Sequence, residues 1–330
     1  ILNEIMVSKA LWALQVTGKN KLCLAGGVAL NCVANQKLVE HIGENSLHFF
    51  SASGDAGGAL GAAALQFVEL NHDQLKNRDF RLKINGSKLG KEYSSEACER
   101  FLVGSNVKFT ELSVKQLAKV VAEQINRGKV VGVFSGPSEF GPRALGNRSI
   151  LADARVHKGQ IKINMQIKYR ESFRPFAPIV IDEFKSQYFE MNYSSPYMLR
   201  TVQVKSFAKV SENTREDNGA ISIEQRLNEF YSAIPGVTHL DGSARVQTIP
   251  SSDKSITSEI LREFHKITKC PVLINTSFNV RGEPIVGSPK DAFNCFMTTG
   301  LDYLILENFL ISKKDVLHLR HNYLTKVSED

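Results

Sequence analysis

The sequence predicts an α/β protein that also contains α+β elements and has two domains, and three observations lead to this prediction. The first 70 residues alternate between helical and strand patterns, as layered α/β folds do. Two of the predicted strands end in glycine-rich turns. The chain has 330 residues, which at about 100–200 residues per domain allows two domains. Its 42% hydrophobic and 23% charged residues exclude a largely disordered chain, and no apolar run approaches the ~20 residues of a membrane span.

The first domain is predicted from its helical and strand periods in order. The apolar residues Ala10, Leu11 and Leu14 recur at helical spacing and, with Ile5, predict an amphipathic helix over residues 5–15. A strand follows at 21–25, a helix at 32–41, a strand at 47–50 and a helix at 57–70. Two strands are too few for a complete domain of this type, so we expect part of this lobe to lie upstream.

The second domain is predicted to begin after a polar stretch. Residues 71–100 show no clear hydrophobic periodicity, so we interpret them as a linker. We place the domain boundary near residue 90, which gives one domain at 1–90 and a second at 91–330. Ser113 and Gln116 form a capping box that starts a helix over 113–127, which Gly128 ends. Ser288 is the expected N-cap of a later helix. The other elements are strands at 129–134, 177–181, 198–204, 271–275 and 301–306 and helices at 256–267 and 289–297, which together predict a mixed sheet.

Most of the net charge lies in one segment. The formal charge is +7, and residues 141–174 hold eight basic and two acidic residues. The arginines there lie among Gly, Pro and apolar residues, which favours an anion pocket over a solvated basic face. The five cysteines are scattered and form no C-x-x-C pair, so we expect reduced thiols and a cytoplasmic protein.

Glycine-rich turns follow both strands of the first domain. Gly26 and Gly27 lie where a strand meets a helix, a place at which backbone N–H groups can approach a phosphate. Asp55 lies at the second such turn, where a carboxylate can reach a metal ion. Taken singly, a packing turn and an N-cap explain these two features better. Together they are more suggestive, because both turns would face one sheet edge.

The basic segment contains the densest signal. Arg143 and Arg148 lie in a Gly/Pro-rich context, and guanidinium groups suit phosphate and carboxylate geometry. Lys168 and Arg170 alternate, so on a strand both would point to one face, although an exposed polar face explains the alternation equally well. Farther along, two polar residues at the end of a buried strand share a face in the same way, Ser277 and Asn279.

A third cluster places His239, Asp241 and Arg245 within seven residues. These residues could form an acid–base group, but their spacing favours a hydrogen-bonded turn. Aromatic residues interleave the basic stretch and would suit base stacking on RNA, although beside proline they more often pack in a core.

Taken together, the motifs resemble one family, the nodulation-type O-carbamoyltransferases, which also act in antibiotic and toxin biosynthesis. The matching stretches occur in family order and span nearly the whole chain. They are GGVALN at 26–31, GDAGGALGAA at 54–63, EFGPRALGNRSILAD at 139–153, IKYRESFRPFAP at 167–178, PGVTHLDGSARVQT at 235–248, NTSFNVRGEPIVGSPKDA at 275–292 and TTGLDYLIL at 298–306.

The resemblance implies a fold and a chemistry. Residues 1–90 would be the end of an actin/sugar-kinase-like domain, and residues 91–330 a YrdC/Sua5-like domain with a twisted mixed sheet and flanking helices. ATP and carbamoyl phosphate would form carbamoyl-adenylate in the YrdC-like domain, and the carbamoyl group would pass to an acceptor hydroxyl in the first domain. A divalent metal, Fe or Mg, is also implied.

The resemblance also assigns roles to residues. The catalytic set would be Lys168, Arg170, Arg143 and Arg148. The nucleotide and cofactor contacts would be Gly26, Gly27, Asn31, Ser277, Asn279, His239 and Arg245, and the metal ligand Asp55.

The sequence departs from the family pattern at its start, because the family's H-x-x-x-H metal motif and His-Asp pair do not occur in it. We therefore expect the C-terminal portion of such an enzyme, incomplete for the transfer step. A hydrogenase-maturation-type carbamoyltransferase and a YrdC-like nucleotide- or RNA-binding module are the alternatives. We expect a small-molecule hydroxyl acceptor, no nucleic acid and no membrane as partners, and leave a homodimer open.

Overall fold

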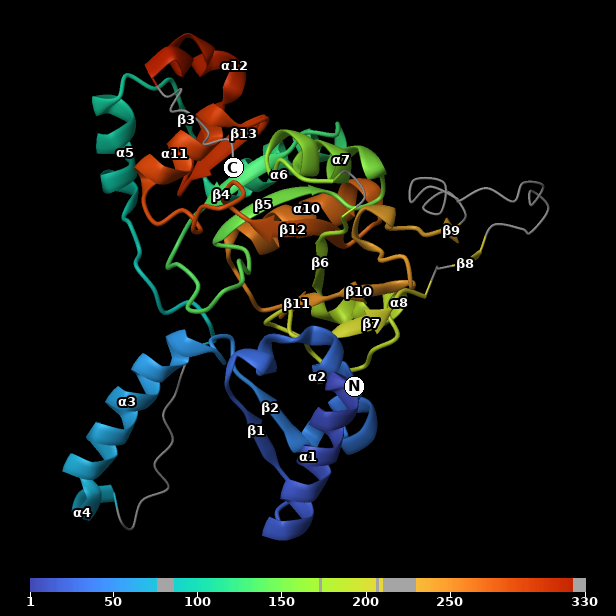
Figure 1. Cartoon of the computed structure of the whole chain (residues 1–330). Coiled ribbons are helices and arrows are strands. Elements are labelled where there is room, and N and C mark those ends of the chain that lie inside the picture. The colour runs from blue at the N-terminus through green and yellow to red at the C-terminus, as the bar shows by residue number, and fades with distance from the viewer. Residues whose placement is uncertain (76–85, 172–173, 206–207, 210–229, 323–330) are drawn as a thin grey trace. The chain divides into compact units, whose positions relative to one another are not determined.

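The computed structural model describes residues 1–75, 86–171, 174–205, 208–209 and 230–322 (Figure 1). The chain divides into two compact units. Unit 1 comprises Ile1–Gly90, Glu139–Arg143 and Tyr197–Thr201, and unit 2 comprises Lys91–Ser138, Ala144–Pro196 and Val202–Asp330. No helix in the described part of the chain is long and apolar enough to cross a membrane.

Unit 1 has the predicted order of helices and strands. Helix α1 (Leu2–Thr17) packs against α2 (Cys32–Ile42), and strand β1 (Leu22–Leu24) pairs in parallel with β2 (Leu47–Phe49). The single-turn helices η1 (Gly27–Leu30) and η2 (Glu44–Ser46) precede α2 and β2. Helices α3 (Asp55–Leu70) and α4 (His72–Leu75) complete the unit, and α3 has no buried side chain.

Residues 139–143 fold with unit 1 because their backbone meets the turn after β2. The Ser51 hydroxyl donates to the Phe140 carbonyl at 3.0 Å, and the rings of Phe50 and Phe140 lie 6.5 Å apart. Gly141 has a φ of +129°, and a Cβ there would lie 2.5 Å from the Ser51 carbonyl oxygen. Only glycine fits this close approach.

Unit 2 is built on a mixed sheet of eight strands in the order β11-β6-β12-β5-β4-β13-β14-β3 (Figure 1). Strand β12 runs antiparallel to β5 and β6, whereas β13 is parallel to β4. The mixed α/β architecture predicted from the sequence is therefore confirmed. The strands are β3 (Thr110–Glu111), β4 (Val131–Phe134), β5 (Arg148–Asp153), β6 (Ala177–Ile181), β11 (Gln247–Ile249), β12 (Val272–Ser277), β13 (Tyr303–Leu306) and β14 (Phe309–Ser312).

The helices of unit 2 cover this sheet with their apolar sides. Helix α6 (Val114–Asn126) has the predicted capping box of Ser113 and Gln116, and it packs against α10 (Ile256–Thr268). Helix α11 (Pro289–Thr298), capped by Ser288 as predicted, packs on β4 and β13. The remaining elements are α5 (Ser95–Gly104), α7 (His157–Gln166), η3 (Asp182–Phe184), α8 (Lys185–Tyr188), β7 (Thr201–Gln203), β8 (Ala208–Lys209), β9 (Phe230–Tyr231), η4 (Pro235–Val237), β10 (Ser243–Arg245), α12 (Lys313–Val316) and η5 (Leu317–Asn322).

Several elements of unit 2 differ from the sequence prediction, among them α5, β5 and α7. The polar stretch read as a linker contains α5, whose Ser94 cap and buried Cys98 and Leu102 mark a short amphipathic helix. Strand β5 starts at Arg148, so the second half of the basic motif forms a fully buried strand in the middle of the sheet. Helix α7 precedes Lys168, and the expected strand through Lys168 and Arg170 does not form.

Candidate functional site

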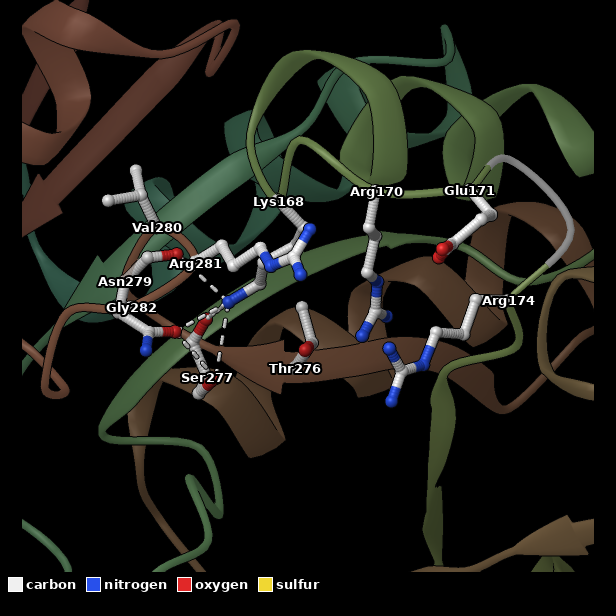
Figure 2. A pocket seen from close by; sticks show the side chains of 10 residues that line it. All are labelled: Lys168, Arg170, Glu171, Arg174, Thr276, Ser277, Asn279, Val280, Arg281 and Gly282. Carbon is white, nitrogen blue, oxygen red and sulfur yellow. Dashed lines mark hydrogen bonds between the residues drawn. The ribbon is translucent and has the colours of Figure 1, made fainter. Parts of the chain in front are cut away.

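A cavity of about 240 Å³ lies in unit 2 between the segment that follows α7 and the end of β12 (Figure 2). The two segments are more than 100 positions apart in the sequence, and the sheet brings them together. Four residues predicted for the anion pocket line it, namely Lys168, Arg170, Ser277 and Asn279. The other lining residues are Glu171, Arg174, Thr276, Val280, Arg281 and Gly282.

The end of α7 turns both basic side chains into the cavity. The backbone N–H of Lys168 donates to the Ile163 carbonyl at 2.9 Å, and that of Arg170 to the Asn164 carbonyl at 3.0 Å. Tyr169 between them has a φ of +44°, in the left-handed region. This tight turn, rather than a strand, places Lys168 and Arg170 on the same side.

The ammonium group of Lys168 is held by four acceptors at the end of β12. Its Nζ lies 2.7 Å from the Ser277 carbonyl, 3.2 Å from the Ser277 hydroxyl, 2.9 Å from the Asn279 carbonyl and 2.6 Å from Asn279 Oδ1. Burial lowers the pKa of Lys168 to about 8, and the nearby Arg170 cation acts in the same direction. Lys168 therefore ties the two walls of the cavity together.

Arg170 is oriented by two contacts on its own wall. Its Nε donates to Asn164 Oδ1 at 2.7 Å, and its guanidinium carbon lies 4.8 Å from the centre of the Phe176 ring. Burial lowers the pKa of Arg170 to about 10, with Arg174 as the next contribution in that direction. In Figure 2 the guanidinium groups of Arg170 and Arg174 lie side by side at the cavity.

The opposite wall is the tight turn after β12. Glu283 N donates to the Val280 carbonyl at 3.4 Å, and Gly282 has a φ of +81°, as the third residue of a type II turn requires. Asn279 Nδ2 donates to the Glu283 carbonyl at 2.6 Å. The Ser277 hydroxyl donates to Asn279 Oδ1 at 2.7 Å. Ser277 and Asn279 thus shape the turn that carries Arg281.

The charge of the cavity suits an anion with several oxygens. Its lining contains one lysine and three arginines against a single carboxylate, Glu171. Guanidinium groups bind phosphate and carboxylate in a bidentate manner, and several together favour a multiply charged group. Sequence reasoning missed Arg174 and Arg281 as site residues, although the first belongs to the basic segment and the second follows Asn279 by two positions.

Arg148 does not line this cavity. Its side chain is almost fully buried, and its guanidinium donates to the carbonyls of Ser135, Asn147 and Lys91 at 3.2, 2.9 and 3.2 Å. It also lies 3.6 Å over the Phe134 ring. These contacts fix the loop before β5, so Arg148 has a structural place here, and its assignment to the pocket stays a prediction.

The remaining predicted residues of the first domain lie in unit 1, as does Arg143. Gly26 donates its N–H to the Ser53 carbonyl at 2.7 Å, and Gly27 begins η1. Asn31 is the N-cap of α2, where its Oδ1 accepts from Val33 N and Ala34 N at 3.1 Å. The side-chain oxygen of Asn31 is thus used in capping α2, and the assignment of Asn31 to a nucleotide site stays a prediction.

Asp55 is the first residue of α3 and is exposed. Within the described ranges, no group of three or more His, Cys, Asp or Glu side chains could hold a metal ion. One carboxylate is a weak site, since metals usually take at least three protein ligands. The described residues therefore do not fit the metal that the family resemblance implies.

His239 lies in the hydrogen-bonded turn that the spacing favoured, and Arg245 is the last residue of β10, which follows that turn. His239 N donates to the Ser243 carbonyl at 2.8 Å, and Ser243 Oγ lies 3.1 Å from His239 Nδ1. The Ser243 hydroxyl also donates to Asp241 Oδ1 at 2.7 Å. Burial lowers the pKa of His239. Neither His239 nor Arg245 is among the described residues that line the cavity of Figure 2.

A second cavity of about 470 Å³ adjoins the same loop. It begins at Glu283, directly after the lining of the first cavity, and includes the buried thiol of Cys295 on α11. Burial raises the pKa of Cys295 to about 12, so the thiol is uncharged at neutral pH. Its other lining residues are Pro284, Ile285, Val286, Gly287, Asp291, Asn294 and Thr298.

Two family models match the chain. Residues 122–313 match the carbamoyltransferase C-terminus, and residues 1–64 match the carbamoyltransferase N-terminus. The first match covers most of unit 2, including every residue of the cavity in Figure 2.

Individual relatives are similar over most of this chain. An uncharacterized protein of Synechocystis sp. is 46% identical over 301 residues, which are 90% of this chain and 48% of that protein. Nodulation protein NolO of Bradyrhizobium diazoefficiens is 37% identical over 306 residues, covering 91% and 50%. Nodulation protein U of Sinorhizobium fredii is 32% identical over 284 residues, covering 85% and 44%. The chain spans about half the length of these relatives.

A solved structure, that of full-length HypF in the phosphate- and nucleotide-bound form, aligns with 63% of this chain and 22% of its own. The TM-score is 0.32 and the identity 14%, values that support no inference about fold or ligands.

Proposed function

The chain belongs to the carbamoyltransferase family, and from this premise we propose that it forms carbamoyl-adenylate from carbamoyl phosphate and ATP. The activated carbamoyl group then passes to a hydroxyl of a small-molecule acceptor. The observation that carries the proposal is the cavity of Figure 2, where Lys168 and three arginines surround a space of about 240 Å³. This space is smaller than the roughly 300–1,000 Å³ of drug-sized ligand pockets, so it would hold the phosphate-bearing part of a nucleotide.

The proposed reaction balances in three steps. Water releases phosphate from carbamoyl phosphate and leaves carbamate. A carbamate oxygen then attacks the α-phosphorus of ATP, the α–β bond breaks, and pyrophosphate leaves. Finally the acceptor hydroxyl attacks the carbamoyl carbon, AMP leaves with the bonding electrons, and the hydroxyl proton is released.

The cavity residues would act on the second step. Negative charge concentrates on the bridging oxygen of the leaving pyrophosphate as the α–β bond breaks. Fixed cations near that charge lower the barrier without having to reorganise. Arg170 and Arg174 are suited to this role, because Arg170 is already oriented by Asn164 and Phe176.

The finer assignments are proposals as well. The K-x-R pair at Lys168 and Arg170 facing the S-x-N pair at Ser277 and Asn279 supports a YrdC-like fold for unit 2. We propose that unit 1 is actin/sugar-kinase-like and serves the transfer step. Because the chain spans about half the length of its relatives, we expect transfer from a protein of their full length and adenylation from this chain alone.

The test is pyrophosphate release by the 330-residue chain, measured with ATP, with carbamoyl phosphate, and with both. The proposal predicts release only when both are present. An exposed arginine of the same unit that lines neither cavity, Arg127, provides the control variant Arg127→Gln, which should match the wild type. Release that does not depend on carbamoyl phosphate would overturn the proposal.

A further inference from the structure

We infer that Arg281 is the residue that grips the phosphoryl group of the ligand from the β12 side of the cavity. This inference rests on the proposed function, since it assumes that the cavity binds a phosphoryl group. It assigns a ligand contact to a residue that lies on the exposed turn after β12, outside the basic segment. Figure 2 shows Arg281 on the turn after β12, whereas Arg170 and Arg174 come from the other wall of the cavity.

The Ser277 and Asn279 side chains of this wall are already engaged in hydrogen bonds within the protein. The Ser277 hydroxyl donates to Asn279 Oδ1, and that same oxygen accepts from Lys168 Nζ. Asn279 Nδ2 donates to the Glu283 carbonyl. These groups stabilise the wall, and an anion could recruit them only by breaking short hydrogen bonds.

The ammonium group of Lys168 is also engaged by the protein. Its three N–H donors have four protein acceptors within 3.2 Å, all on Ser277 and Asn279. Its charge acts on the cavity electrostatically, but its donors are occupied. The direct contacts must therefore come largely from arginines.

The three arginines come from two different walls of the cavity. Arg170 and Arg174 come from the segment after α7, whereas Arg281 is the one cation among the described lining residues that the β12 side supplies. A phosphoryl group has oxygens on all sides, so a complete clamp needs donors from both walls. Arg281 supplies the donors of the β12 wall from the type II turn. A hydrogen bond from Val286 N to the Phe278 carbonyl, at 3.0 Å, joins the two ends of the loop that contains this turn.

The experiment measures the affinity of the full chain for inorganic pyrophosphate by calorimetry at two salt concentrations. Arg281→Gln should weaken binding about tenfold or more, the effect of one charge-assisted hydrogen-bonding group. Its salt dependence should also be shallower, since one cationic contact is lost. Arg281→Lys should recover part of the affinity, because the charge remains and the fork is lost. Arg127→Gln is the matched control for a lost surface arginine, and its affinity should stay within twofold of the wild type.

The melting temperature of Arg281→Gln should equal that of the wild type, because its side chain is exposed. Affinity of Arg281→Gln within twofold of the wild type would overturn the inference, as would an equal loss in Arg127→Gln. A wild type that binds no pyrophosphate would overturn both the inference and the pocket. A wild type that binds pyrophosphate through Arg281 but releases none from ATP and carbamoyl phosphate would overturn the proposed function and leave the inference standing.

Discussion

The two units differ in what happens to their apolar side chains. In unit 2, α10 buries Ile256, Ile260, Leu261 and Phe264 against its neighbours. In unit 1, α1 leaves Trp12 64% exposed, and α3 leaves Leu65 61% and Leu70 76% exposed. Hydrophobic periodicity at helical spacing therefore predicts that a helix forms, but it does not predict which residues pack over the apolar side of that helix. Unit 2 supplies its own cover, whereas the described part of unit 1 does not.

The candidate site follows the same division. In unit 2, residues distant in the sequence converge on one cavity, because β12 and the segment after α7 meet there. In unit 1, Gly26 and Asn31 have local structural roles, and Asp55 is exposed at the start of α3. We therefore propose that the adenylation chemistry belongs to unit 2 alone.

The largest expected effect tests that assignment. Arg170→Ala should abolish pyrophosphate release that depends on carbamoyl phosphate, since losing a charged partner of a buried phosphate costs about 2–5 kcal/mol, or roughly 30-fold or more. Arg170→Lys should recover little, because the fork is lost. Lys37, an exposed residue of unit 1, serves as the control for the loss of a cation. The Lys37→Ala variant should release pyrophosphate at the wild-type rate.

Circular dichroism is the folding control for these variants. Wild-type rates in a folded Arg170→Ala chain would mean that the basic segment is a solvated face and that the comparison between the units fails for function.

The next effect tests the comparison of the cores. Phe264→Ala removes a fully buried ring and should cost about 3–5 kcal/mol of unfolding free energy. Leu65→Ala in α3 should change it by less than about 0.5 kcal/mol, because this side chain is mostly exposed. Denaturant unfolding of both variants measures the contrast, and equal losses would show that the exposed face of α3 is covered in solution.

Much of the fold was predictable where a hydrophobic periodicity extends over a whole helix and an N-cap residue marks where that helix begins. Helices α6, α10 and α11 lie within a few residues of their predicted bounds, and the Ser113 and Ser288 caps are as expected. Strand β5 was not predicted, because it begins with Arg148 and its burial depends on Phe134 stacking and backbone acceptors. Helix α5 was not predicted because most of its residues are polar or exposed. Only Cys98 and Leu102 are buried, which is too short an apolar pattern to indicate a helix.

Four of the ten residues that line the candidate site were predictable from the sequence. Lys168, Arg170, Ser277 and Asn279 were grouped correctly in space, although the strand expected for the first pair is a turn at Tyr169. Arg281 could not be placed from its sequence, because its position depends on the φ of Gly282 and on the Asn279–Glu283 contact. The contacts of Lys168 with Ser277 and Asn279, by contrast, form only once the sheet has brought the two walls together.

A smaller effect concerns the pH dependence of anion binding, which follows from the burial of Lys168 and is not expected of an exposed lysine. Burial lowers the pKa of Lys168 to about 8, with Arg170 and the Cys295 thiol as its charged or titratable neighbours. Lys168 loses its proton as pH rises through that value, so anion binding should weaken by up to about tenfold between pH 7 and pH 9. Sulfate is the appropriate probe, because its charge is constant over this range.

Calorimetry of sulfate binding at both pH values measures the change. Lys168→Gln should bind sulfate more weakly at pH 7 and show a flatter pH profile. A wild-type affinity that is constant from pH 7 to pH 9 would contradict the lowered pKa.

The smallest effect compares helix caps, for which we expect the two units to be alike. Ser113→Ala in unit 2 and Asn31→Ala in unit 1 each remove an N-cap acceptor and should each cost about 1 kcal/mol. Thermal unfolding with helix content as the signal measures both. A cost confined to Ser113→Ala would show that unit 1 unfolds separately from unit 2.

The most direct test of the central claim is detection of carbamoyl-adenylate itself. The chain is mixed with ATP and carbamoyl phosphate, quenched within a single turnover, and the nucleotides are analysed by mass spectrometry. The account predicts a mass equal to AMP plus a carbamoyl group in the wild type and in Lys37→Ala, and its absence in Arg170→Ala. Carbamoyl-adenylate at wild-type amounts in a folded Arg170→Ala chain, or none in the wild type, would contradict the claim that the cavity of unit 2 performs this chemistry.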